Sequence, residues 1–164
     1  MSAATPVSAS SARRAIRRLA VIALAALVTA CGGGPDLEGY FDQVAEIGRV
    51  QNIRSAAIAG ATPDRDDIAE IVDLRRDGLR ELRAIEAPDD VAGLHNEFVG
   101  AFERVVTLAE AFLRDTEGLD DRAFTEALSA SVEIDEAQRR FSAFCRALEI
   151  EAAGLGVPDV DLSC

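Results

Sequence analysis

From Asp36 to about Ala153, apolar residues recur every three or four positions, and this spacing constrains the fold of the chain more than any other feature. No stretch alternates apolar and polar residues as a half-buried strand would. The pattern therefore predicts an all-α fold with four helical segments. Their expected ranges are about 36–60, 63–87, 89–118 and 120–153.

The residues at the proposed helix ends agree with these ranges. Thr62 belongs to a residue type that caps helices, and Pro63 suits the first helical position. The second segment should stop before Pro88, and Gly118 is a candidate C-cap for the third. Acidic residues, which complement the helix dipole, cluster at the four starts. They are Asp36, Glu38, Asp64, Asp66, Asp67, Asp89, Asp90, Asp120 and Asp121.

Similar helix lengths and short connections favour antiparallel neighbours. Three of the segments would span roughly 37 to 42 Å at 1.5 Å per residue. We therefore expect a four-helix antiparallel (up-down-up-down) bundle over residues 36–164. The fourth segment is longer by several residues, so it should overhang or bend.

The charge of the chain excludes one class of partner. All 17 basic residues are arginines, and the segment from Cys31 onward carries 13 of them against 29 acidic residues, a formal charge of −16. Nucleic acid phosphates would repel such a surface, and no basic patch offsets the repulsion. Nucleic acid is therefore not expected as a partner.

Residues 1–30 have the organisation of a secretory signal peptide. Four arginines between Arg13 and Arg18 precede a 12-residue apolar run, 19–30. A membrane-spanning helix needs roughly 20 apolar residues, so this run is short for a span. An uncleaved signal anchor is the alternative interpretation.

The end of this run, Val28-Thr29-Ala30-Cys31, resembles the signal of bacterial lipoproteins. The resemblance implies diacylglycerol on the Cys31 sulfur, cleavage between Ala30 and Cys31, and a membrane partner reached through that lipid. Two or three acyl chains give stable anchoring. Residues 31–35, with three glycines, would form a short flexible tether. The expected location is the extracytoplasmic face of the cell membrane, or an outer membrane where the organism has one.

Two further cysteines, Cys145 and Cys164, remain once Cys31 carries lipid. The compartment outside the membrane is generally oxidising. Pro158 prevents the last helix from resuming, and ten extended residues reach about 33 Å, enough to return to Cys145. We predict a Cys145–Cys164 disulfide that pins the C-terminal tail. The alternatives are two free thiols or a bond from Cys164 to another chain.

Several polar side chains fall near core-facing helical positions. Such residues could line a pocket for an anionic ligand, with Arg54 or Arg75 holding it. They could instead extend to the edge of the bundle or pair with one another. The residues are Gln51, Arg54, Arg75, Ser131 and Gln138.

His95 is the single histidine, and it lies on the apolar stripe of the third segment. It is a weaker candidate for the same pocket. No second histidine exists and the only methionine is Met1, so haem would lack its pair of axial ligands. Zinc would lack thiolate ligands, because one cysteine is expected to carry lipid and the other two to form a disulfide. The structural interpretation is a core or helix-junction histidine that hydrogen-bonds a carbonyl or a carboxylate. We predict no metal and no cofactor.

The sequence lacks the signatures of common enzyme classes, including phosphate-binding loops, nucleophile elbows and HExxH. The expectation is a non-enzymatic, lipid-anchored envelope lipoprotein that interacts with another envelope component. The alternative is a helical bundle that binds or senses a small ligand in a pocket between helices.

Overall fold

The computed structural model describes residues 36–59 and 63–163, and within these ranges the chain forms five helices and no strand. The predicted all-α fold is confirmed. The predicted signal peptide, Cys31, the tether and Cys164 lie outside the described residues. The helices are α2 (Leu37–Ala59), α3 (Arg65–Ala84), α4 (Asp89–Asp115), α5 (Asp121–Ser129) and α6 (Val132–Gly154).

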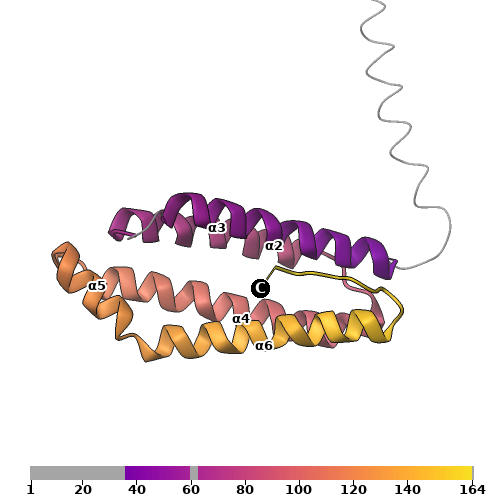
Figure 1. The fold of residues 1–164 in the computed structure, drawn as a ribbon. Helices are drawn as coiled ribbons and strands as arrows, with labels where there is room; N and C mark the ends of the chain where they lie inside the picture. The colour runs from indigo at the N-terminus through magenta and orange to yellow at the C-terminus, as the bar shows by residue number, and fades with distance from the viewer. Residues whose placement is uncertain (1–35, 60–62, 164) are drawn as a thin grey trace, which may run out of the picture. The chain divides into compact units, whose positions relative to one another are not determined.

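The helices pack as a helical bundle around an apolar core. α2 packs against α3, α3 against α4, and α4 against α6. Figure 1 shows α2 with α3 along one side and α4 with α6 along the other. Each long helix contributes its apolar stripe to the core. The core includes Tyr40, Phe41, Val44, Leu79, Leu82, Phe98, Phe102, Cys145 and Leu148.

Acidic residues close the starts of three helices through hydrogen bonds. At α2 the Asp36 carboxylate accepts from the Gly39 N–H at 2.5 Å. The Asp64 carboxylate accepts from the Asp67 N–H at 2.9 Å, and the Asp67 carboxylate accepts from the Asp64 N–H at 3.1 Å. This capping box satisfies N–H groups that the first turn leaves unpaired. Asp120 caps α5 through the N–H three residues on, at 2.8 Å. Because Asp64 takes the cap, α3 begins at Arg65 and not at Pro63.

The single helix predicted over 120–153 is wrong, because the chain breaks at Ala130 and Ser131 into α5 and α6. A continuous helix of about 34 residues would span about 51 Å, against about 40 Å for the neighbouring α4. The break redirects α5, and Phe124 becomes buried, with its ring centroid 5.3 Å from that of Phe112 on α4. The excess length therefore packs against the bundle, and the apolar side chain of Phe124 is removed from water.

Arg65 joins the start of α3 to the end of α4. Its Nη1 donates to the Leu113 carbonyl at 3.0 Å, and its Nη2 donates to the Thr116 carbonyl. The guanidinium carbon also lies 4.5 Å from the centroid of the Phe124 ring. Carbonyls in the last turn of a helix have no partner within the helix, so this arginine satisfies groups that would otherwise be exposed or unpaired.

After α6 the chain reverses direction. Gly156 has a φ of 86°, a left-handed conformation that glycine adopts without strain, and the Val157 N–H donates to the Ala152 carbonyl at 2.9 Å. We call residues 157–163 the C-terminal tail. Figure 1 shows the tail running back along the bundle between α2 and α6.

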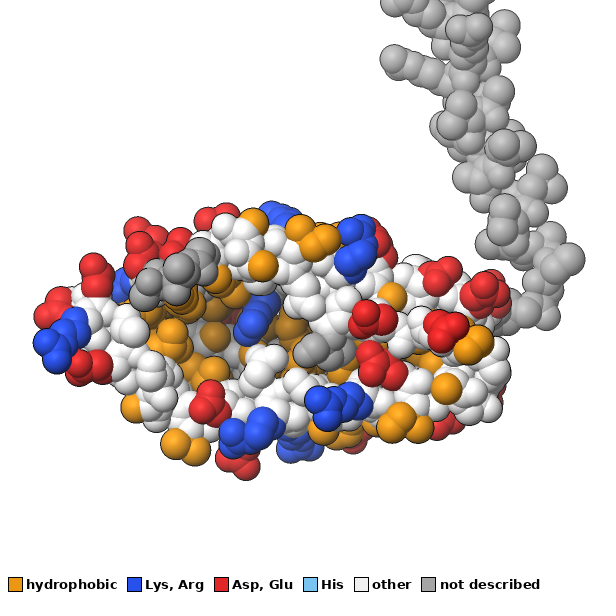
Figure 2. Space-filling model, in the orientation of Figure 1, with side chains coloured by type: hydrophobic (Ala, Val, Ile, Leu, Met, Phe, Trp, Pro, Cys, Tyr) orange, Lys and Arg blue, Asp and Glu red, His pale blue; other side chains and the backbone are white. Residues whose placement is uncertain are grey.

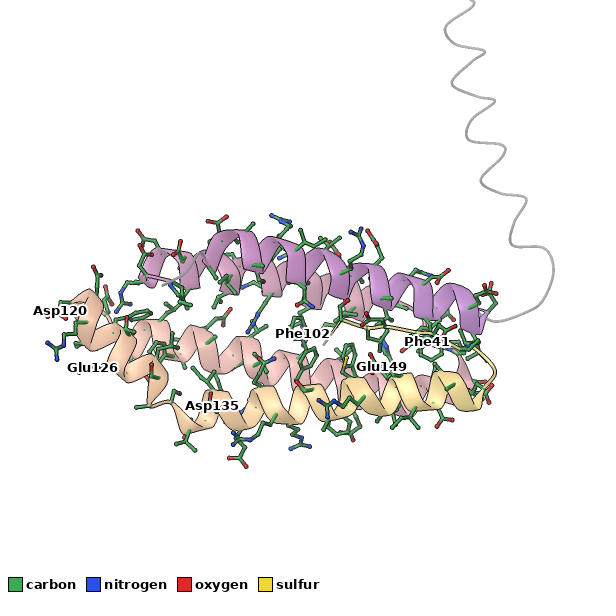
Figure 3. All side chains as sticks on the ribbon, in the orientation of Figure 1. Phe41, Phe102, Asp120, Glu126, Asp135 and Glu149 are labelled. Atoms are coloured by element: carbon green, nitrogen blue, oxygen red, sulfur yellow. The ribbon has the colours of Figure 1, made fainter. Side chains whose placement is uncertain are left out.

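Contacts of the C-terminal tail bridge α2 and α6. Leu162 is 2% exposed, and its N–H donates to Glu149 Oε1 on α6 at 3.0 Å; Figure 3 shows Glu149 beside the tail. The Leu162 carbonyl lies against Gly48 of α2, where a Cβ would collide with it. Asn52 of α2 donates to the Ser163 carbonyl. The tail therefore closes part of the gap between these two helices.

Candidate ligand-binding cavity

A cavity of about 100 Å³ lies between the four long helices, and the C-terminal tail contributes to its wall. Figure 2 shows the hollowed face of the bundle, with apolar side chains along it and a Lys or Arg side chain inside. The described residues that line the cavity are Val44, Ile47, Gly48, Gln51, Asn52, Ser55, Arg75, Leu82, Phe98, Phe102, Gln138, Phe141, Leu162 and Ser163.

Arg75 is the charged residue of this lining. It follows Ile71 by four residues and precedes Gly78 by three, so α3 places it on the same buried face as these two. Its guanidinium makes no hydrogen bond or ion pair with any described residue. Burial lowers the pKa of Arg75, because the charged form loses water. A guanidinium nevertheless stays protonated in proteins, so the cavity holds a cation that no described residue neutralises.

Gln51 brings a second unsatisfied group to the cavity. Its Nε2 donates to the Leu74 carbonyl of α3 at 3.0 Å, which directs Oε1 the other way. That Oε1 is buried and has no hydrogen-bond partner. Gly78 makes the arrangement possible, because a Cβ there would lie 2.5 Å from Gln51 Nε2. A buried acceptor without a partner is uncommon and indicates a missing donor.

Aromatic rings form part of the cavity wall. Phe98 and Phe102 of α4 pack on Phe141 of α6, with centroid distances of 5.2 Å and 5.0 Å. Figure 3 shows Phe102 pointing from α4 into the space between the helices. Leu82 of α3 and Val44 of α2 add further apolar lining. The cavity lining thus combines charged and polar groups with an apolar surface.

The structure brings together some of the polar residues singled out in the sequence. Gln51, Arg75 and Gln138 all line the cavity. Arg54 is exposed on α2 and does not line it, because it lies on the outer face of that helix. Ser131 lies at the start of α6, outside the cavity lining. Of the two arginines considered as anion ligands, Arg75 is the one at the cavity.

His95 lies elsewhere in the core, as the structural interpretation expected, but its side-chain partner is a hydroxyl and not a carbonyl or carboxylate. Its Nδ1 is 3.1 Å from the Tyr40 hydroxyl, and the two rings meet edge to face. Burial raises the pKa of Tyr40 to about 12 and lowers the pKa of His95. Both groups are therefore neutral at pH 7. The pair acts as a hydrogen-bonded connection between α2 and α4, and His95 is not part of the cavity lining.

Sequence reasoning missed Asn52, Ser55 and Ser163 as lining residues and Gly48 as the seat of the tail. Asn52 and Ser55 lie on the polar side of the pattern along α2, and Ser163 comes from an irregular segment. One signal in the sequence could have indicated these close contacts, namely the glycines inside helical segments. Gly48 and Gly78 both occupy helix interiors, where glycine is unfavourable unless another group approaches closely.

Within residues 36–59 and 63–163, no three His, Cys, Asp or Glu side chains gather as metal ligands would. None of the helices in these ranges has the length and apolarity to cross a bilayer.

Comparisons of the chain with protein-family models, with curated proteins and with solved structures find no match. The chemistry of the cavity is therefore the guide to function. Its polar groups are one guanidinium, three amides and two hydroxyls, and its described lining contains no carboxylate, imidazole or thiol. Such a set can hold an anion by charge and hydrogen bonds.

Proposed function

We propose that this chain is a lipid-anchored envelope lipoprotein whose helical bundle binds a small anionic ligand without catalysing its conversion. The observation that carries the proposal is Arg75, a guanidinium that lines a cavity and has no partner among the described residues. Placing a cation in a half-buried position without a counter-charge is unfavourable, so the position of Arg75 at the cavity favours a role for the charge. This favours ligand binding over a purely structural module.

The lipid anchor in the proposal rests on the sequence. Val28-Thr29-Ala30-Cys31 is similar to a lipoprotein signal, and the apolar run before it is short for a membrane span. Lipid on Cys31 would hold the binding domain at the extracytoplasmic membrane surface, where it meets solutes before they reach the membrane.

The finer architecture belongs to the proposal as well. The four long helices would alternate in direction, with α5 inserted before the last, and a Cys145–Cys164 disulfide would fix the tail. Cys145 is fully buried on α6 and lies one turn before Glu149, which already holds Leu162 of the tail. The tail thus returns toward the part of α6 that carries Cys145.

A thermal-shift and calorimetric screen of the full chain with small anions tests ligand binding. An anion that raises Tm should lose its effect in Arg75→Gln and keep it in Arg54→Gln, which removes the same charge from an exposed position of α2. The proposal fails if no anion binds, or if both variants bind as the wild type does.

The anchor has its own test. Cells fed a labelled fatty acid should label the wild-type protein and not the Cys31→Ser variant. The wild type should fractionate with membranes, and the variant should not. Labelling that survives the substitution would contradict the assignment of Cys31.

A further inference from the structure

We infer that the ligand is a short monocarboxylate that also carries a hydroxyl group. This inference rests on the proposed anion-binding function. Three properties of the cavity lead to this class: its single charge, its unpaired acceptor and its size.

The charge of the lining fits one negative charge. Arg75 is the charged residue there, and the other polar lining groups are amides and hydroxyls. A monoanion neutralises the guanidinium. A dianion such as succinate, or the doubly charged form of phosphate, would bring one excess charge into a partly dehydrated site with no second cation. A planar carboxylate also matches the fork of a guanidinium through two parallel hydrogen bonds.

The unpaired acceptor requires a donor on the ligand. Gln51 Oε1 is buried without a partner, while Nε2 of the same amide is held by the Leu74 carbonyl. An acceptor that is left unsatisfied in a bound complex weakens that complex. A hydroxyl on the ligand would donate to Oε1, and a simple fatty acid would leave it unpaired.

The size and the apolar wall limit the rest of the molecule. The cavity of about 100 Å³ is smaller than an engineered cavity of about 150 Å³ that accepts benzene. By the same proportion the cavity encloses about four non-hydrogen atoms, so a ligand of about six would extend partly into its open side (Figure 2). The rings of Phe98, Phe102 and Phe141 in the lining favour a short hydrocarbon part on the ligand. Lactate, with three carbons, one carboxylate and one hydroxyl, represents the class.

The test is calorimetry on the full chain with four probes: lactate, propanoate, succinate and inorganic phosphate. Propanoate differs from lactate only by the hydroxyl. We expect lactate to bind at least tenfold more tightly than each of the other three, and its binding to be lost in Arg75→Gln and kept in Arg54→Gln.

Gln51→Met tests the role of the acceptor. Lactate and propanoate should then bind with Kd values within about twofold of each other, while Gln43→Met, at an exposed site of α2, should keep the tenfold preference. If Gln51→Met does not fold, the comparison of lactate with propanoate on the wild type decides the point alone.

Each other outcome has a defined meaning. Equal binding of propanoate and lactate to the wild type overturns the hydroxyl requirement. Tighter binding of phosphate or succinate, sensitive to Arg75→Gln, overturns the monocarboxylate and leaves the proposed anion-binding function standing. If none of the four probes binds, the inference is overturned; the proposed function falls with it only if the wider anion screen is also negative.

Discussion

The Tyr40 hydroxyl and the His95 ring form a buried hydrogen bond, 3.1 Å between Oη and Nδ1, that connects α2 to α4 at the core. Tyr40 is 1% exposed and His95 is 6% exposed, so neither ring has ready access to water. Protonation of His95 would place a charge in this environment, and burial accordingly lowers its pKa.

We predict that the protein loses stability through His95 as the solution becomes acidic. The pKa of His95 in the folded state lies below its usual value of 6.5. Between these two values the unfolded state binds more protons, so the free energy of unfolding falls as the pH falls. The stability that depends on neutral His95 is fully present above pH 6.5 and is lost as the pH falls toward the lowered pKa of His95. The free energy of unfolding, measured with urea at several pH values, should depend less on pH in His95→Gln than in the wild type. Equal pH dependence of the two proteins would contradict this account.

Replacing Arg75 with methionine should stabilise the protein when no ligand is present. The substitution keeps a long side chain in the cavity and removes a half-buried charge that has no partner among the described residues. We expect the free energy of unfolding to rise by about 1 kcal/mol. Arg54→Met, on the exposed side of α2, should change it by less than about 0.5 kcal/mol. A marked loss of stability in Arg75→Met would show that the guanidinium supports the fold.

Gly48→Ala should destabilise the protein although alanine favours helices. A Cβ at position 48 collides with the Leu162 carbonyl, and a backbone atom cannot move aside cheaply. We expect a loss of about 2 kcal/mol in denaturant unfolding. Gly100→Ala in α4 is the matched control, because a Cβ there meets nothing within 4 Å. The free energy of unfolding of Gly100→Ala should rise by up to about 1 kcal/mol. If both variants change the stability in the same direction, the contact between Gly48 and the tail does not have the proposed effect.

Arg65→Met should weaken the end of the bundle where α3, α4 and α5 meet. The change removes two hydrogen bonds to carbonyls at the end of α4 and the contact with Phe124. We expect a loss of about 1 to 3 kcal/mol. Arg122→Met removes only an exposed ion pair with Glu126 and should have little effect on Tm. Similar Tm values for the two variants would contradict a special role for Arg65.

The proposed Cys145–Cys164 disulfide predicts a defined response to reduction. The intact protein should gain two mass units on reduction, and neither thiol should react with an alkylating reagent beforehand. Loss of the bond should lower the free energy of unfolding by about 3 kcal/mol in the chain-entropy model. Cys164→Ser should reproduce the loss, and alkylation of Cys164 in the native protein would refute the bond.

The apolar spacing predicted the long helices correctly, because it places an apolar stripe along one face of each helix and such stripes are buried in a common core. The stripe through Val91, Phe98 and Phe102 is buried as expected, and α2 and α4 begin within a residue of their predicted starts. An overhang or bend of the long fourth segment was expected, but its division into two helices at Ala130 and Ser131 was not, because these residues have no strong tendency to end a helix. The break depends on the distance available beside α4, which a local pattern does not contain.

The cavity was predictable only in part. Gln51 and Arg75 stood out because polar residues at buried positions need an explanation. Arg54 and Arg75 were equivalent candidates in the sequence, since a small change in the assumed rotation of a helix moves an arginine from outside to inside. The partnership of Gln51 with Gly78 joins two different helices, so it became visible only when α2 and α3 were packed together.

The contact between Asn52 and Ser163 has a consequence for the order of folding. It joins residues 111 positions apart, and α2 must wait for Leu162 and Ser163 before the partners of Gly48 and Asn52 exist. Contacts of such long sequence separation are slow to form. Because α2 emerges first during synthesis, we expect the α2 side of the cavity to remain uncovered until Leu162 and Ser163 have been made. Closure of the cavity would then follow the packing of all four long helices.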